Sequence, residues 1–134
     1  MRLAIQADAE AIADVYFACY RLLDFLPRLH DLDSCRWYVA RTVTVAEDDS
    51  GIVAFVERRG EEMGHFYTRP DRIGQGVGTQ LVEAAKASGV DALELWCFQA
   101  NTRARRFYEA RGFRASRFTD GADNEERTPD VRYR

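Results

Sequence analysis

Three glycines at alternate positions, Gly74, Gly76 and Gly78, lie between a strand-like run and a helical pattern. Residues without side chains let the backbone approach a phosphate closely. The first amide hydrogens of a helix have no partner within it, and the helix dipole favours negative charge at that end. The spacing therefore predicts an anion-binding loop at the start of a helix. A bare turn before the helix is the alternative interpretation of these glycines taken alone.

A second stretch, residues 99–113, predicts a helix that carries a phenol. Asn101 suits the N-cap, because its side chain can accept the orphan amide hydrogens of the first turn. Phe107 and Tyr108 then fall on one face, and Gly112 suits the C′ position, where positive φ is needed. A phenol with a pKa of about 10 can donate a proton to a leaving group. The alternative interpretation is that Tyr108 only packs beside Phe107.

Together the two stretches read Pro-x-x-x-Gly-x-Gly-x-Gly-x-x-Leu and Asn-x-x-Ala-x-x-Phe-Tyr-Glu-x-x-Gly-Phe. This pair resembles the GNAT family of acyl-CoA-dependent N-acetyltransferases. The resemblance covers essentially the whole chain, so a single GNAT domain is expected over residues 1–134. It implies an α/β (mixed α+β) fold with a central mixed, mostly antiparallel sheet that is splayed at the cofactor site and flanked by helices. The segments Thr119–Glu126 and Pro129–Tyr133 look like one bacterial branch of the family.

The resemblance implies transfer of an acetyl group from acetyl-CoA to a primary amine of a small molecule or peptide, by direct attack of the amine on the thioester. No metal is expected. The glycine loop would wrap the pyrophosphate of coenzyme A, and backbone amides of Phe66–Thr68 would polarise the acetyl carbonyl. The expected catalytic residues are Tyr108, for the thiolate leaving group, and Asn101, for the pantetheine arm. The expected cofactor contacts are Phe66, Tyr67, Thr68, Ile73, Gly74, Gln75, Gly76, Val77, Gly78, Thr79, Asn101, Arg103, Arg106, Phe107 and Tyr108, with Arg103 or Arg106 at the 3′-phosphate.

One position departs from the family pattern. The residue before the first glycine is usually Arg or Gln, but in this chain it is Ile73. A side chain able to reach phosphate is therefore missing from its expected place. Arg72, one place earlier, and Gln75, two places later, are expected to substitute in part.

The general base stays open between several groups. The candidate base or substrate side chains are His30, Glu62, His65, Glu125 and Glu126. A chain of water molecules could also accept the proton. For each side chain taken alone, a structural or solvated role is the alternative interpretation. If the acidic tail loop overhangs the site, it would attract a cationic amine.

Two other functions compete with an acetyltransferase. One is a GNAT-fold module that binds acyl-CoA without turnover. The other is a dinucleotide-binding domain, since Glu94 follows Gly74 at the spacing of the acidic residue in that fingerprint. The second is disfavoured because Thr79 stands at the third glycine position and the loop lies in the middle of the chain.

The chain has 134 residues and a formal net charge of −3, which suits one domain and gives no indication of nucleic-acid binding. No apolar run approaches the roughly 20 residues that span a bilayer, and no signal-peptide core follows Met1. A cytoplasmic protein without membrane contact is therefore expected, and a homodimer is left open. Cys19, Cys35 and Cys97 lack disulfide or zinc spacing, which favours reduced core thiols.

Hydrophobic periodicity predicts the elements that position these groups. A helix capped by Asp8, a helix over Asp33–Arg41 and a helix ending near Gly89 are expected besides the Asn101 helix. The expected strands are one near Leu3, then Thr42–Glu47, Ile52–Glu57, Met63–Thr68, Ala92–Phe98, Phe113–Thr119 and Val131–Tyr133. The sheet should become parallel around the glycine-loop helix, because a strand-helix-strand crossover joins parallel neighbours.

Overall fold

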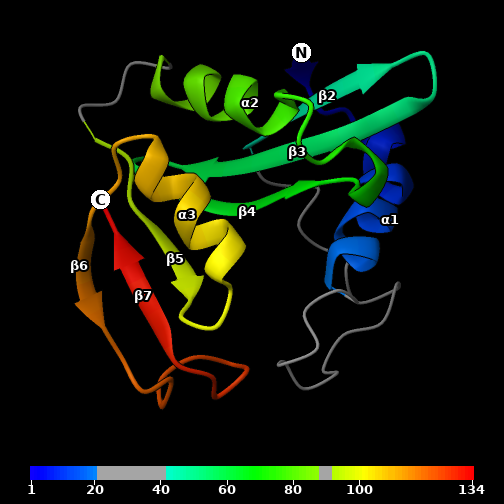
Figure 1. Ribbon diagram of the computed structural model, residues 1–134. Coiled ribbons are helices and arrows are strands. Elements are labelled where there is room, and N and C mark those ends of the chain that lie inside the picture. The colour runs from blue at the N-terminus through cyan, green and yellow to red at the C-terminus, as the bar shows by residue number, and fades with distance from the viewer. Residues whose placement is uncertain (21–41, 88–91) are drawn as a thin grey trace.

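The computed structural model describes residues 1–20, 42–87 and 92–134. These residues form two antiparallel sheets, with strand orders β1-β2-β3-β4 and β5-β7-β6, and helices packed around them (Figure 1). The strands are β1 (Arg2–Leu3), β2 (Thr42–Asp48), β3 (Gly51–Arg59), β4 (Glu62–Thr68), β5 (Leu95–Phe98), β6 (Ala115–Phe118) and β7 (Asp130–Tyr133). The α helices are α1 (Ala9–Tyr20), α2 (Val77–Lys86) and α3 (Thr102–Ala110), and short 3-10 turns cover Gln6–Asp8 and Pro70–Arg72.

The two sheets meet at one point, where β4 approaches β5. Glu62 and Glu94 form an isolated parallel bridge. Around it, the Met63 amide donates to the Glu94 carbonyl and the Glu94 amide donates to the Glu61 carbonyl, both at 2.8 Å. Beyond the bridge the two strands diverge (Figure 1). The structure thus confirms a mixed, mostly antiparallel sheet that is splayed in its centre, and α2 is the crossover that makes the contact parallel.

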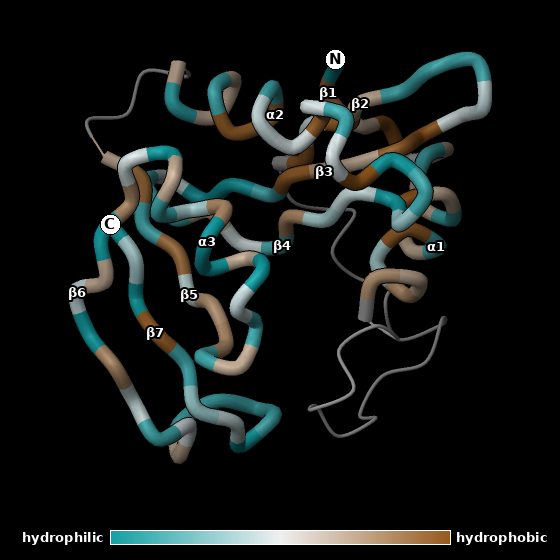
Figure 2. Tube along the Cα trace, in the orientation of Figure 1, coloured by the Kyte–Doolittle hydropathy of each residue, from teal (hydrophilic) through white to brown (hydrophobic). Residues whose placement is uncertain are grey.

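The core forms on both faces of the first sheet. Val43, Val45 and Phe55 pack with the buried side of α1, whereas Ala54 and Val56 pack with α2 and the second sheet. Successive side chains of a strand point to opposite faces, so β3 is apolar on both sides. Figure 2 shows hydrophobic residues gathered along β3 and present in β5, and a mostly hydrophilic β6–β7 loop. No helix among the described residues is long and apolar enough to cross a membrane.

Both ends of α3 form as their residue types predict. The Asn101 side chain accepts the Ala104 amide at 3.2 Å, which confirms the N-cap. At the other end Gly112 adopts φ +91°. The Gly112 amide donates to the Glu109 carbonyl and the Phe113 amide to the Tyr108 carbonyl, which is the Schellman pattern. The Tyr108 backbone is therefore fixed at the last turn of the helix.

Several boundaries differ from the sequence-based expectation. Asp8 is the last residue of a 3-10 turn, and its carboxylate accepts from the Arg2 guanidinium and the Ile5 amide. The strand expected at Ala92–Phe98 begins at Leu95, because its partner β7 ends at Tyr133, which pairs with Leu95. The strand expected at Phe113–Thr119 covers only Ala115–Phe118, and α2 ends at Lys86. The helix expected at Asp33–Arg41 lies outside the described residues. Pro27, His30 and Cys35 lie outside them too.

Candidate active site

A cavity of about 1040 Å³ opens where β4 and β5 diverge. Its walls come from the end of α1, the end of β3, β4, the glycine loop, the first turn of α2, β5 and α3, with one residue from the β6–β7 loop. The motifs that the sequence analysis singled out therefore surround one space. Of the residues expected at the cofactor, the cavity lining includes Phe66, Tyr67, Thr68, Ile73, Gly74, Gly76, Gly78, Thr79, Asn101, Arg103, Phe107 and Tyr108, but not Gln75, Val77 or Arg106.

The glycine loop has the geometry of an anion cradle. Gly74 and Gly76 adopt φ of +86° and +85°, and a Cβ added at either would meet nothing within 4 Å. Gly76 is the N-cap of α2, and its carbonyl accepts the Gln80 amide in the first helical hydrogen bond. The amides before Gln80 therefore have no partner inside the helix. These open backbone positions fit a pyrophosphate group, which needs several amide donors and no side chain in the way.

Gly78 has a different reason to be glycine. Its φ is ordinary, but an added Cβ would lie 3.3 Å from the Phe66 ring and 3.4 Å from the Phe107 ring. Those two rings meet edge to face at 5.6 Å between centroids. The missing side chain therefore lets α2 pack closely on β4 and α3.

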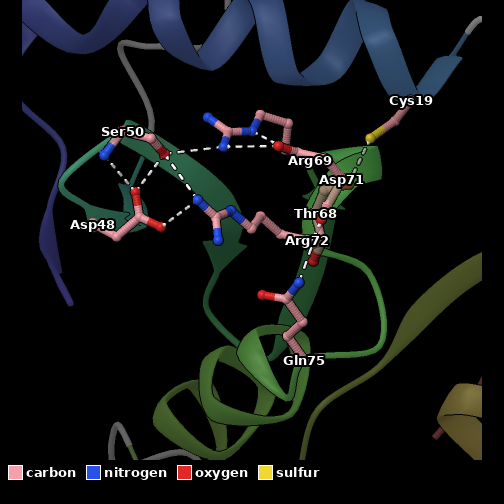
Figure 3. Close-up of polar contacts among 8 residues, drawn as sticks. All are labelled: Cys19, Asp48, Ser50, Thr68, Arg69, Asp71, Arg72 and Gln75. Carbon is pink, nitrogen blue, oxygen red and sulfur yellow. Dashed lines mark hydrogen bonds and ion pairs between the residues drawn. The ribbon is translucent and has the colours of Figure 1, made fainter.

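The polar side chains nearest Ile73, those of Arg72 and Gln75, both bond to other protein groups (Figure 3). Arg72 pairs with Asp48, 3.1 Å between Nη2 and Oδ2, and donates to the Ser50 hydroxyl. The Gln75 side chain donates to the Asp71 carbonyl at 3.4 Å. Both residues that were expected to replace the missing phosphate ligand thus have protein partners, and Arg72 links the loop to the β2–β3 turn.

Tyr108 lies in an aromatic cluster at the centre of the cavity wall. Its ring centroid is 5.5 Å from that of Phe107, 5.7 Å from Phe113, 6.0 Å from Tyr133 and 6.3 Å from Phe66. Burial raises the pKa of Tyr108 above its usual value. The phenol is therefore held in its protonated form, in which it can donate a proton.

The free edge of β4 supplies backbone donors at the split. The Arg69 amide donates to the Val53 carbonyl of β3, and the registers of Phe55 with Tyr67 and Val56 with Phe66 continue this ladder. Because amide directions alternate along a strand, the Phe66 and Thr68 amides point away from β3, toward the diverging β5. These are backbone groups that could polarise a carbonyl in the cavity.

A bulge in β4 sets the position of His65. Val56 pairs with Phe66 and Arg58 pairs with Met63, so Gly64 and His65 both lie opposite Glu57. A bulge re-aims side chains and is common beside active sites. His65 Nε2 lies 4.0 Å from the Glu57 Oε2, and the His65 ring contacts Tyr16 edge to face at 5.1 Å between centroids. His65 and Glu57 both line the cavity.

Glu57 and Arg111 are among the cavity residues that are not predicted from the sequence. Glu57 ends a run of apolar residues, and its side chain is only 2% exposed. An ionisable residue inside such a run is the signal that could have identified it. Arg111 lies over the Phe107 ring, 3.7 Å from its centroid, and donates from Nε to the Thr79 hydroxyl at 3.0 Å. It places a cation beside the start of α2.

The remaining residues that were candidates for the general base or the substrate contact differ in whether they line the cavity. Glu126 is half-buried and lines the cavity, whereas Glu125 is exposed and does not. Glu62 reaches the cavity rim but pairs with Arg132 at 2.7 Å. His30 lies outside the described residues. Cys19 and Cys97 are buried free thiols, as expected.

The region around this cavity matches a known family. Residues 39–115 match the model of the acetyltransferase (GNAT) domain. The chain belongs to the GNAT family of acetyltransferases. The match includes the glycine loop and α3, so the resemblance drawn from those two motifs is confirmed.

Several known proteins are similar to this chain over most of their lengths. An uncharacterized N-acetyltransferase of Archaeoglobus fulgidus is 29% identical over 135 residues, which cover 85% of this chain and 92% of the relative. The apo form of YjaB from Escherichia coli has a TM-score of 0.85 at 25% identity, covering 98% of this chain and 93% of YjaB. YncA from Salmonella typhimurium, solved with its cofactor acetyl-CoA, has a TM-score of 0.71 at 20% identity, covering 98% of this chain and 89% of YncA.

Proposed function

We propose that this GNAT protein transfers an acetyl group from acetyl-CoA to a primary amine of a small molecule or peptide, by direct attack of the amine on the thioester. The observation that carries the proposal is that one cavity joins an anion cradle at Gly74 and Gly76 to the protonated phenol of Tyr108. YncA, of the same fold, binds acetyl-CoA. The phosphate end and the reactive end of such a donor would thus lie in one continuous space.

The residues at the two ends of the cavity have separate roles in this reaction. Acetyl-CoA supplies a thioester whose carbonyl carbon bonds to the amine nitrogen while its bond to sulfur breaks. The amides of the glycine loop, with Arg103 and Arg111 beside the cavity, bind the phosphates. The Phe66 and Thr68 amides polarise the carbonyl, and Tyr108 donates its proton to the departing sulfur. Asn101 orients the pantetheine arm from the start of α3.

The amine must also lose a proton as it attacks. His65 is the best-placed acceptor, because it lines the cavity and lies 4.0 Å from the buried Glu57 carboxylate. The carboxylate would stabilise the imidazolium that forms when His65 accepts that proton. The proton lost by the amine and the proton gained by sulfur balance, so the products are an N-acetylated amine and a free thiol.

A coenzyme A-binding module without turnover is the remaining alternative. The phenol and the base pair in one cavity favour catalysis over it. A dinucleotide-binding domain is not supported, because β4, which leads into the glycine loop, pairs antiparallel with β3.

Thermal unfolding with added ligands tests the donor. We expect acetyl-CoA to raise the melting temperature and NAD to leave it unchanged, since a ligand that binds only the folded state stabilises it. Release of free thiol in the presence of a panel of amines then tests turnover. Stabilisation by NAD and not by acetyl-CoA would overturn the proposal, and stabilisation by acetyl-CoA without thiol release on any amine would favour the binding module.

A further inference from the structure

The side of the cavity proposed for the acceptor amine is lined by different kinds of side chain from the side proposed for the phosphates. Along β4, Phe66 points to Phe107 on α3, whereas His65 and Tyr67 point to Tyr16 on α1. Tyr67 packs edge to face on Tyr16, with 5.1 Å between ring centroids. We call the group formed by Tyr16, Glu57, His65, Tyr67 and Glu126 the acceptor compartment, because all five line the same cavity.

Glu126 enters this compartment from the β6–β7 loop. It is close enough to Tyr67 to contribute, after burial and the neighbouring Tyr16, Tyr108 and Cys19, to raising the pKa of that phenol. Among the residues that the structure describes, no side chain donates a hydrogen bond or forms an ion pair with the Glu126 carboxylate. Glu57, by contrast, pairs with Arg59 at 3.2 Å. Glu126 is therefore the carboxylate of the compartment that is available to a ligand.

The loop that carries Glu126 is built to hold it in place. Asn124 donates to the Thr128 carbonyl at 2.6 Å and to the Asp130 carboxylate, and accepts the Thr128 amide at 3.1 Å. The Gln99 side chain, at the β5–α3 junction, donates to the Thr119 and Asp130 carbonyls at 2.8 and 2.9 Å. The loop is thus tied both to itself and to the end of β5. A preorganised carboxylate loses little conformational freedom when it binds a partner.

Gly121 closes the same loop tightly. An added Cβ there would lie 2.3 Å from the Thr128 backbone, and Gly121 has φ +84°. The residue after Glu126, Arg127, is at φ +51°, the left-handed region that non-glycine residues rarely adopt. The loop that contains Gly121 and Arg127 therefore acts as a scaffold for Glu126.

The chemistry of this compartment selects a positive charge. Aromatic faces and carboxylates are the groups that bind ammonium ions in proteins. The phosphate side carries arginines and helix amides, so charge changes sign along the cavity. An acceptor with a single amine must present that amine as a neutral nucleophile near His65, and it leaves Glu126 without a partner.

Resting on the proposed function, we infer that the acceptor is a small aliphatic diamine or polyamine, with one amine at His65 and a second, protonated amine bound by Glu126 beside the packed Tyr16 and Tyr67 rings. Glu126 is then a specificity-determining residue that contacts the substrate at a distance from the reacting atoms. A carboxylate on the acceptor, as in a free amino acid, would be repelled by the same residues.

A matched set of amines tests this inference on the whole protein. Butylamine, putrescine and ornithine share a chain length and differ by one ammonium and one carboxylate. Each is titrated by calorimetry into the protein saturated with coenzyme A, and each is assayed for thiol release from acetyl-CoA. Longer diamines and spermidine extend the series. We expect putrescine or a longer diamine to bind at least about tenfold more tightly than butylamine, and ornithine to bind more weakly than putrescine.

Glu126→Gln and Asp123→Asn form the matched pair of variants. Asp123 lies on the same loop but is exposed and outside the cavity lining. We expect Glu126→Gln to raise the KM for the preferred diamine about tenfold or more, with kcat and the KM for acetyl-CoA little changed and with no effect on butylamine. Asp123→Asn should change none of these values.

The outcomes separate this inference from the proposed function. Acetyl-CoA binding and acetyl transfer, with diamines no better than monoamines or with Glu126→Gln acting equally on both, would overturn the diamine assignment and leave the acetyltransferase intact. Preference for a lysine-containing peptide over every free diamine would also overturn it. Loss of acetyl-CoA binding in the parent protein would instead defeat the proposed function.

Discussion

The role of Tyr108 rests on one hydroxyl group, which Tyr108→Phe removes without changing the ring. We expect the chemical step to slow by roughly a hundredfold to ten-thousandfold, the usual scale for a general acid. The affinity for coenzyme A should stay unchanged, because the aromatic contacts with Phe66 and Phe107 remain. Single-turnover kinetics measures the first quantity and calorimetric titration the second.

Tyr133→Phe is the matched control. The Tyr133 hydroxyl already bonds to Arg105 and to the Glu109 carboxylate, and Tyr133 is absent from the cavity lining. This variant should lose stability and keep the chemical step. If Tyr108→Phe turned over as fast as the parent, Tyr108 would be a packing residue.

A substitution of Ile73 tests whether the missing phosphate ligand lowers the affinity for coenzyme A. Its backbone is extended, at φ −65° and ψ 137°, so an arginine fits without strain, and the side chain faces the cavity. Arg72 is held by Asp48 and Ser50, which leaves the position without a mobile cation. We expect Ile73→Arg to tighten coenzyme A binding by about 1 kcal/mol, and by at most about 3 kcal/mol, the range for a charge-assisted hydrogen bond.

Ile73→Met is the control for side-chain length without charge. Calorimetric titration of both variants should show tighter binding only with arginine. Equal or weaker binding with Ile73→Arg in a folded protein would mean that the loop needs an apolar residue at this position.

Single residues with local roles were predictable from the sequence. Asn101 and Gly112 act on backbone groups within a few residues of themselves, so their spacing alone predicts the cap and the Schellman turn. Glu57 acts on His65 across the β3–β4 hairpin, and Arg111 acts on Thr79, which lies 32 residues earlier in the chain. Only the folded structure brings those pairs together, and for that reason neither residue was predicted.

At the scale of elements, a substitution in the glycine loop tests whether its backbone binds phosphate. Gly76→Val places a branched side chain where a phosphate would meet the backbone, at a residue with φ +85°. We expect coenzyme A binding to be abolished and the free energy of unfolding to fall by roughly 1 to 2 kcal/mol from the left-handed conformation. Thermal unfolding and calorimetry together give both values.

Gly60→Val separates strain from ligand contact. Gly60 lies in the turn between β3 and β4 with φ +57°, and it is not part of the cavity lining. It should lose a similar amount of stability and keep its affinity for coenzyme A. Retained affinity in Gly76→Val would show that the loop is only a turn.

Element types were easier to predict than element geometry. The alternation and turn residues around Asp48–Gly51 gave the correct β2–β3 hairpin, because the Ser50 amide bonds to the Asp48 side chain within the turn. The bulge at Gly64 and His65 depends on which residue of β3 each one faces. That register is a property of two strands together, and no single-strand pattern contains it.

At the scale of the whole molecule, the cavity exists because the sheet is split. The parallel contact between Glu62 and Glu94 holds the two halves together at one end only. The parallel crossover was predictable from the strand-helix-strand order, whereas the angle between the halves depends on packing in the shared core of α2, β5 and β7. The two motifs and the β6–β7 loop are brought around one space by that angle.

The same burial that shapes the cavity makes the fold sensitive to alkali. Burial raises the pKa of Cys19 and of Cys97 to about 12. In the unfolded chain each thiol loses its proton above about pH 8.5. Between these values the folded state binds more protons than the unfolded state, so the free energy of unfolding falls as pH rises. The Cys19 thiol also donates to the Thr68 carbonyl at 3.0 Å, a bond that a thiolate cannot make.

Replacing both thiols should therefore flatten the pH dependence of stability. Each thiol contributes at most about 1.4 kcal/mol per pH unit within this window. Urea unfolding at about pH 7.5 and about pH 10 gives the slope for the parent and for the double variant Cys19→Ala, Cys97→Ala. The variant should be less stable at the lower pH, because two buried side chains are shortened, yet lose less stability on going to the higher pH. Since Cys35, the lysine and the tyrosines are common to both proteins, they cancel in the comparison, and parallel slopes would show that the two thiols ionise as readily in the folded protein as in the unfolded chain.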